Sequence, residues 1–87
     1  MLEVRYFEQY ARDDGRVQNH PPSIYDAARW YKEFRLEVEI GGQRLGASHR
    51  ESCMVPFVDD PTFNSHMKKR LAGMIGRHIE YEIRGQL

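Results

Sequence analysis

Two five-residue segments of the chain alternate apolar residues with glutamate. Residues 36–40 read Leu-Glu-Val-Glu-Ile, and residues 79–83 read Ile-Glu-Tyr-Glu-Ile. Successive side chains of a strand point to opposite faces of a sheet, so each segment would place its apolar side chains on one face and two carboxylates on the other. The alternation predicts two strands of a sheet with one buried face and one solvated face.

Other parts of the chain also favour strands. Leu2–Tyr10 is rich in aromatic and β-branched residues, and a short strand around Arg16–Gln18 can pair back on it. Gly41-Gly42 separates two strand-like runs and predicts a two-residue hairpin turn, with the returning strand at residues 43–52.

The hairpin register pairs side chains of matching character. It places Val38 opposite Leu45 on the buried face and Glu39 opposite Arg44 on the solvated face. Both pairs stabilise this register, because opposite charges and apolar side chains interact favourably across neighbouring strands.

Two segments have the spacing of amphipathic helices. Ser23 resembles a helix N-cap and starts a predicted helix that runs to Phe34. Asp60-Pro61 is a typical helix start, and the helix after it reaches His78. The apolar stripes are Ile24, Ala27, Ala28, Tyr31 and Phe34 in the first helix, and Phe63, Met67, Leu71, Met74, Ile75 and His78 in the second.

The resulting order is strand, helix, strand, strand, helix, strand. With Ile79–Arg84 as the last strand, this order predicts a ferredoxin-like β-α-β-β-α-β fold of the α+β class. The four-stranded antiparallel sheet would carry both helices on one face. We expect a single domain over residues 1–87.

Composition narrows the function classes only slightly. Thirteen basic and thirteen acidic residues cancel, which argues against a dedicated nucleic-acid binder but not against a local basic patch. Cys53 is the one cysteine, so no internal disulfide can form. No apolar run is long enough to span a bilayer, and we expect a cytoplasmic protein.

The residues that usually carry catalysis are scattered. No two histidines have metal-ligand spacing on one helix face, and Cys53 has no second cysteine, so we expect no metal, no cofactor and no enzymatic activity. Gly15-Arg16-Val17-Gln18 resembles part of the phosphate loop of acylphosphatases. The resemblance covers only these four residues, and the glycine and phenylalanine-arginine pair that continue the family's loop are absent. It therefore does not predict that activity.

The solvated face of the predicted sheet is rich in charge of both signs. It would carry Glu3, Glu37, Glu39, Glu80 and Glu82 together with Arg5, Arg35, Arg44, Arg50 and Arg84. Such a face is either a solvated surface with cross-strand ion pairs or a protein-docking surface on which charge sets orientation. On the second interpretation, the partner-binding residues are Glu37, Glu39, Glu80 and Glu82.

Trp30 lies off the apolar stripe of the first predicted helix, and Tyr25 lies close to it. A tryptophan in this place either covers the edge of the core or stands at a partner surface, where tryptophan is often a hot spot. We add Trp30 and Tyr25 to the candidate partner-binding residues.

The second predicted helix is basic, with Lys68, Lys69, Arg70 and Arg77 and no acidic residue between Asp60 and Glu80. This is either a solvated helix face or a contact for nucleic-acid phosphates or an acidic partner, which would depend steeply on salt.

Protein binding is the favoured function: a small accessory or inhibitory protein that occludes a surface of a larger complex. Compact domains without motifs are frequent among phage and mobile-element proteins, including the anti-CRISPR inhibitors of bacterial defence. The alternative is a nucleic-acid-binding module that uses the basic helix. Homodimerisation through an exposed sheet edge is also open.

Overall fold

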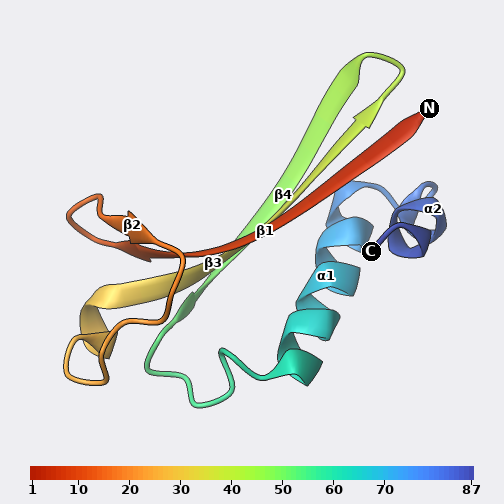
Figure 1. The fold of residues 1–87 in the computed structure, drawn as a ribbon. Helices are drawn as coiled ribbons and strands as arrows, with labels where there is room; N and C mark the ends of the chain where they lie inside the picture. Colours follow the sequence, from red (N-terminus) through yellow and green to blue (C-terminus); the bar gives the residue numbers. More distant parts are fainter.

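The computed structural model describes all residues from 1 to 87 and forms a twisted sheet with two helices on one side (Figure 1). The elements along the chain are the strands β1 (Leu2–Arg12) and β2 (Val17–Gln18), the 3₁₀ helix η1 (Ala27–Arg29), the strands β3 (Trp30–Ile40) and β4 (Gln43–Ser52), and the helices α1 (Pro61–Ile75) and α2 (Glu80–Gly85). The strand order in the sheet is β2-β1-β3-β4, with every neighbouring pair antiparallel.

Strands β1 and β3 form the central pair of the sheet. Their pairing runs from Leu2 opposite Ile40 to Arg12 opposite Trp30 and leaves no interruption between them. The prediction of a first strand is confirmed, with two more residues than expected. The short strand at Val17–Gln18 is also confirmed, since it pairs back on the end of β1.

The predicted hairpin is confirmed in its turn and its register. Gly41 and Gly42 have φ angles of 56° and 79°, a region that favours glycine because a Cβ crowds the backbone there. Val38 lies opposite Leu45. Charges pair on the other face, where Arg44 Nε lies 3.7 Å from Glu39 Oε2.

The predicted helix after Asp60 is also confirmed, as α1. The Asp60 side chain accepts a hydrogen bond of 2.8 Å from the backbone N–H of Thr62, and Pro61 occupies the first turn. The helix ends at Ile75, before Gly76, so the expected extension to His78 is wrong.

The first predicted helix does not form. Residues 23–26 make a turn, η1 follows as one short 3₁₀ helix, and β3 begins at Trp30. Tyr31 and Phe34 fit a helical stripe, but Trp30, Lys32 and Phe34 fit a strand, in which they share the inner face. Only the strand continues the pairing with the far end of β1. Backbone groups of β1 would have lost these partners if the segment had become helical.

The last predicted strand is helix α2. Ile79 and Ile83 are four positions apart, so both face α1 on one side of a helical turn, and both are buried. Tyr81 lies between them in sequence, and strand alternation would have put it on the same face. Its side chain is instead 89% exposed.

The protein therefore belongs to the α+β class, with a four-stranded antiparallel sheet and two helices, but the β-α-β-β-α-β order expected for a ferredoxin-like fold is not the order observed. The helices cover one face of the sheet, and the other face is open (Figure 1). The main core lies between sheet and helices and consists of Phe34, Leu36, Val38, Met67, Leu71, Ala72, Ile79 and Ile83.

Candidate functional site

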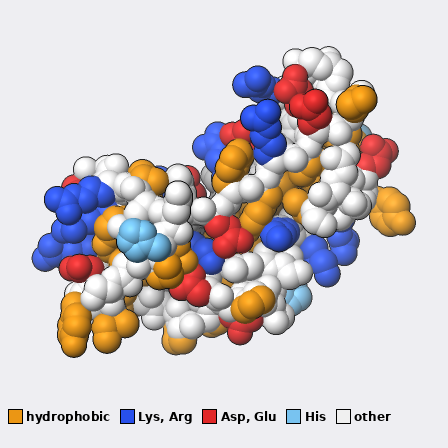
Figure 2. Space-filling model, in the orientation of Figure 1, with side chains coloured by type: hydrophobic (Ala, Val, Ile, Leu, Met, Phe, Trp, Pro, Cys, Tyr) orange, Lys and Arg blue, Asp and Glu red, His pale blue; other side chains and the backbone are white.

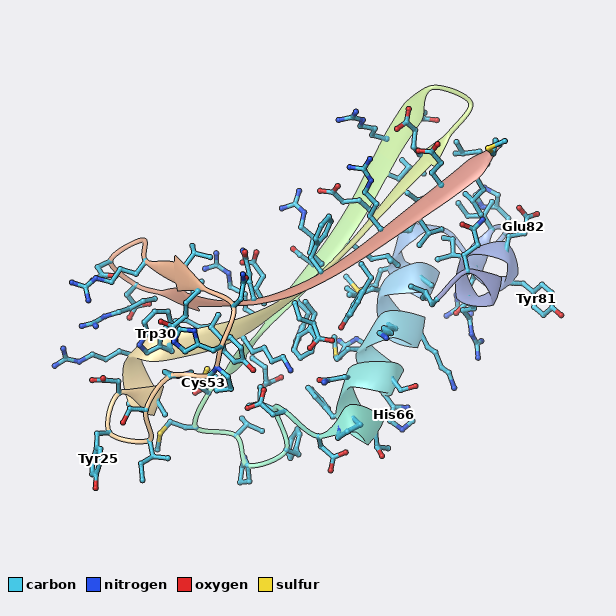
Figure 3. All side chains as sticks on the ribbon, in the orientation of Figure 1. Tyr25, Trp30, Cys53, His66, Tyr81 and Glu82 are labelled. Carbon is cyan, nitrogen blue, oxygen red and sulfur yellow. The ribbon has the colours of Figure 1, made fainter.

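Two highly exposed large apolar residues, Ile24 and Tyr25, lie on an ordered turn at one end of the sheet. We call residues 23–26 the Tyr25 turn. The backbone N–H of Tyr25 donates to Ser23 Oγ at 3.3 Å, and that of Asp26 donates to the Ser23 carbonyl at 2.9 Å. These bonds hold Ile24 and Tyr25 outward, with 83% and 91% of each residue exposed. Figure 3 shows Tyr25 pointing away from the rest of the molecule.

Met54 adds a third large apolar side chain at this end. It lies two residues after the end of β4 and is exposed. The preceding residue, Cys53, donates its backbone N–H to the Trp30 carbonyl at 3.1 Å, which joins this segment to the start of β3. Apolar side chains protrude where the connection between β2 and β3 turns (Figure 2). The structure thus presents Tyr25 as an exposed residue, as the partner-binding hypothesis requires.

Trp30 does not belong to that surface. Only 6% of it is exposed, and it lies on the side of β3 that faces the interior, in alternation with Lys32 and Phe34. Of the two interpretations of Trp30, the one that places it in the core is correct. The interpretation as a partner contact is wrong, because Trp30 lies in a strand and not on the outer side of a helix.

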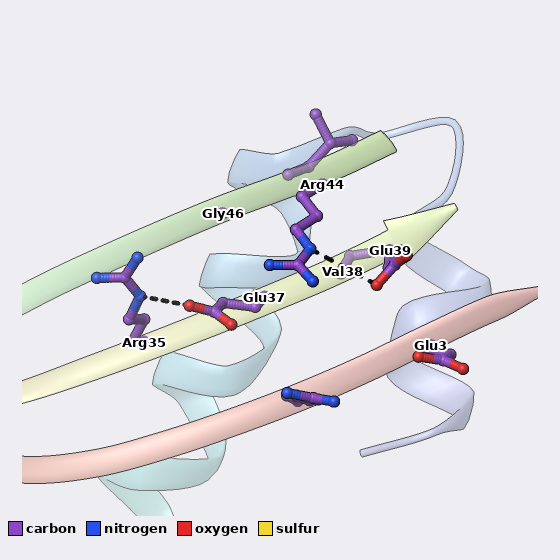
Figure 4. Close-up of a pocket in the computed structure, with 9 residues that line it drawn as sticks. Glu3, Arg35, Glu37, Val38, Glu39, Arg44 and Gly46 are labelled. Carbon is purple, nitrogen blue, oxygen red and sulfur yellow. Dashed lines mark hydrogen bonds and ion pairs between the residues drawn. The ribbon is translucent and has the colours of Figure 1, made fainter. Parts of the chain in front are cut away.

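Glu37 and Glu39 lie on the open face of the sheet, as predicted, and line a shallow depression of about 330 Å³ (Figure 4). Each glutamate has an arginine beside it. Arg35 Nε lies 3.0 Å from Glu37 Oε1, and Arg44 pairs with Glu39 as described above. Four of the nine residues that line the depression belong to these two ion pairs.

The charges of the open face balance. Its strand positions carry four glutamates and four arginines, which sum to zero: Glu3, Glu33, Glu37, Glu39, Arg5, Arg35, Arg44 and Arg50. Arg50 Nε also pairs with Glu33 Oε2, at 2.8 Å. A surface of alternating charge with no net excess offers little attraction to a polyanion, because such attraction needs an excess of cations.

Glu80 and Glu82 are not on the open face, and this part of the prediction is wrong. Both belong to α2, on the helical side of the molecule. Glu80 lies against α1, where a Cβ added at Gly73 would be 2.9 Å from Glu80 Oε1. Glu82 is exposed, and Figure 3 shows it at the outer side of α2.

The basic residues expected on one helix face divide into two groups. Lys68 and Lys69 line a hollow between α1 and α2. Arg70 and Arg77 line a separate hollow, together with Glu80. The structure therefore does not bring the four cations together into one patch.

A buried lysine, which the sequence analysis did not single out, lies on the inner face of β3. Only 2% of Lys32 is exposed, and its Nζ has four oxygen neighbours. They are Glu8 Oε1 at 3.0 Å, Asp59 Oδ1 at 3.1 Å, the Val58 carbonyl at 3.2 Å and Asn64 Oδ1 at 3.2 Å. These oxygens come from β1, from the loop after β4 and from α1, so the ammonium group ties three parts of the fold together.

Three groups near the Lys32 cluster, Tyr6, Tyr10 and Cys53, have pKa values raised above their ordinary values. Burial, a hydrogen bond to Glu8 and the charge of Glu8 raise the pKa of Tyr6 above its ordinary value. Burial and a hydrogen bond to Asp59 do the same for Tyr10. Burial and the charge of Asp59 raise the pKa of the Cys53 thiol, partly offset by the ammonium of Lys32. A thiol with a raised pKa is a poor nucleophile at neutral pH, so this cluster favours stability over covalent chemistry.

The alternation of residues along β3 could have indicated that Lys32 faces inward. Trp30, Phe34, Leu36 and Val38 are all even-numbered and all face inward, and Lys32 shares their parity. The signal was missed because a helix was expected over this segment.

No group of three or more histidine, cysteine, aspartate or glutamate side chains is placed to hold a metal ion. None of the helices has both the length and the apolar character needed to cross a bilayer. Comparisons with protein-family models, curated proteins and solved structures found no match, so a functional assignment depends on the residues of this chain alone.

Proposed function

We propose that this chain is a small, non-enzymatic protein-binding domain, an accessory or inhibitory protein that acts by occluding a surface of a larger complex. Its primary contact is the Tyr25 turn together with Met54. The partner is a protein that offers an apolar pocket rimmed by charge.

The amount of exposed surface supports this proposal. The chain exposes 6079 Å². A compact monomer of 10.3 kDa exposes about 5,400 Å². The excess of about 700 Å² approaches the roughly 800 Å² that one partner buries in a standard protein interface. A bound protein would cover the surface that the thin sheet and small core leave open.

The Tyr25 turn is the observation that carries the proposal. Ile24 and Tyr25 are nearly fully exposed although they are large and apolar, and hydrogen bonds fix the turn beneath them. A fixed turn loses little conformational entropy on binding, so burial of its side chains contributes more of its free energy to affinity. Because the turn is convex, the complementary surface is concave.

The open face of the sheet has a secondary role in this proposal. Glu37 and Glu39 pair with their own arginines, so a partner gains little by forming new ion pairs with them. Their alternating charges set the orientation and the association rate of a protein whose charges alternate in the opposite sense.

The test uses two tyrosines at opposite ends of the molecule. Tyr25 and Tyr81 are 91% and 89% exposed, so Tyr25→Ser and Tyr81→Ser remove equal amounts of exposed aromatic surface. Tagged chains are purified from the native cell under equal conditions. We expect the wild type and Tyr81→Ser to recover the same protein in a stoichiometric amount, and Tyr25→Ser to lose it. Charge reversal of Glu37 and Glu39 should slow its association.

Recovery of the same proteins by all variants would overturn the proposal, as would a partner lost with Tyr81→Ser and kept with Tyr25→Ser. Phage and mobile-element inhibitors such as the anti-CRISPRs are common among compact domains of this kind. A partner that belongs to a bacterial defence complex would place this chain in that functional class.

A further inference from the structure

A hollow of about 530 Å³ is lined by residues of α1 and α2, at the end of the molecule opposite the Tyr25 turn. We call it the α1–α2 notch. It is lined by Ser65, Lys68, Lys69, Tyr81, Arg84, Gly85 and Leu87. Its volume lies within the range of pockets that hold small molecules or a few nucleotides.

The notch has a cationic lining that no acidic side chain cancels. Its three charged side chains are Lys68, Lys69 and Arg84. The nearest acids in sequence lie elsewhere: Glu80 sits against Gly73, and Glu82 leaves α2 on another side from Tyr81 (Figure 3). The net charge of the chain is zero, so the acidic residues that balance these cations lie outside the notch.

Tyr81 lines the notch, and the ring of Tyr6 contacts one of its cations without lining it. The Nζ of Lys68 lies 4.9 Å from the ring centroid of Tyr6, a cation–π contact that restricts this lysine while its ammonium protons stay available. Tyr81 is almost fully exposed, and its hydroxyl makes no hydrogen bond within the chain. Neither burial nor hydrogen bonding within the chain accounts for an aromatic ring in this position.

We propose that the α1–α2 notch binds single-stranded nucleic acid, with backbone phosphates at Lys68, Lys69 and Arg84 and one base stacked on Tyr81. Cationic grooves with an exposed aromatic are the usual means of binding single strands, because every base offers a π face. An acidic peptide would use the cations, but it could stack on Tyr81 only through an aromatic residue, whereas every nucleotide carries a base. A duplex keeps its bases stacked and cannot offer one. This activity goes beyond protein binding by the Tyr25 turn.

The number of cations sets the expected salt dependence. Three phosphate contacts on a single strand correspond to a slope of about −2 in a plot of log affinity against log salt concentration. Lys69→Gln should make the slope shallower by about 0.7, because one fewer counterion is released. Arg44→Gln removes the same charge from the open face and should leave the slope unchanged.

The experiment is a fluorescence-anisotropy titration of a labelled oligothymidylate of about 12 nucleotides. Salt is varied between about 0.05 and 0.2 M. Tyr81→Ala should bind roughly 5- to 150-fold more weakly, while Tyr81→Phe should bind like the wild type, since stacking needs the ring and not the hydroxyl. Circular dichroism of each variant tests that α2 remains folded.

Several results would overturn the proposal. They are a duplex of equal length or an oligoglutamate that binds as tightly as the single strand, an unchanged affinity in Tyr81→Ala, and an equal loss in Arg44→Gln. Tyr25→Ser should bind the oligonucleotide like the wild type. If Tyr25→Ser binds the oligonucleotide like the wild type and no protein partner is found, the proposed protein-binding function fails and the nucleic-acid site stands. If a protein partner is found and the oligonucleotide is not bound, the nucleic-acid site fails and the protein-binding function stands.

Discussion

Replacement of Lys32 by methionine tests the role of the buried ammonium group. Lys32→Met keeps the length and most of the volume of the side chain but removes the ammonium donor from four oxygens, of which Asp59 Oδ1 still accepts from the Tyr10 hydroxyl. Removal of one partner from a buried ion pair costs about 3–5 kcal/mol. Glu8 and Asp59 keep 29% and 49% of their side chains exposed, so water recovers part of that loss. We expect a loss of about 2–4 kcal/mol in the free energy of unfolding.

That loss is large for a chain of this size. At about 0.05–0.15 kcal/mol per residue, the whole chain has a stability of roughly 4–13 kcal/mol. Urea unfolding followed by the fluorescence of Trp30 measures the change, because Trp30 is the one tryptophan and is buried. With a slope near 1 kcal/mol per molar urea, the midpoint should fall by about 2–4 M.

Arg44→Met is the matched control, since it removes a cation whose side chain is 87% exposed and whose partner is 3.7 Å away. Its stability should change by less than about 1 kcal/mol. The expectation is wrong if Lys32→Met is as stable as the wild type. The free-energy cost of burying the ammonium group would then equal the stabilisation from its contacts with the four oxygens. The expectation is also wrong if the two variants lose equal stability.

Two further predictions concern other parts of the chain. Because burial and hydrogen bonds to carboxylates raise the pKa of Tyr6 and Tyr10, the folded chain should keep two of its five tyrosines un-ionised as the pH rises above 10, and its stability should fall over that range. Phenolate absorbance of folded and urea-unfolded chains measures this, and five tyrosines that ionise together would contradict it. Gly73→Ala should stabilise α1 by up to about 1 kcal/mol, because alanine favours helix and the only close neighbour is the movable end of the Glu80 side chain. A clear drop in melting temperature would show that Glu80 cannot move aside.

The elements predicted correctly are those for which local chemistry leaves one answer. Gly41-Gly42 adopts positive φ angles that other residues avoid, and Asp60-Pro61 supplies both a cap and a fixed first φ for α1. The elements predicted wrongly have two valid patterns. The Trp30–Phe34 segment fits a helix stripe and a strand alternation, and Ile79–Ile83 fits both as well. The choice between these patterns depends on neighbours that are distant in sequence.

The candidate sites divide in the same way. Glu37 and Glu39 could be placed on the open face from the sequence because the hairpin that exposes them is local. Tyr25 was expected within a helix, and it is exposed on a turn that the sequence analysis did not predict. The α1–α2 notch could not, since it exists only after residues 79–83 fold as a helix and pack their isoleucines on α1.

By itself, the sequence determined the hairpin and the start of α1. It also determined which alternate positions of the hairpin strands carry charge on the open face, and the overall charge balance. Only the tertiary structure decided that β3 extends to Trp30, that α2 is a helix, and that a lysine lies inside the fold. The physical reason is the same in each case. Backbone pairing with β1, apolar contact with α1, and oxygens contributed by Glu8, Asp59 and Asn64 are long-range interactions, and each outweighs a local preference that is small or evenly divided.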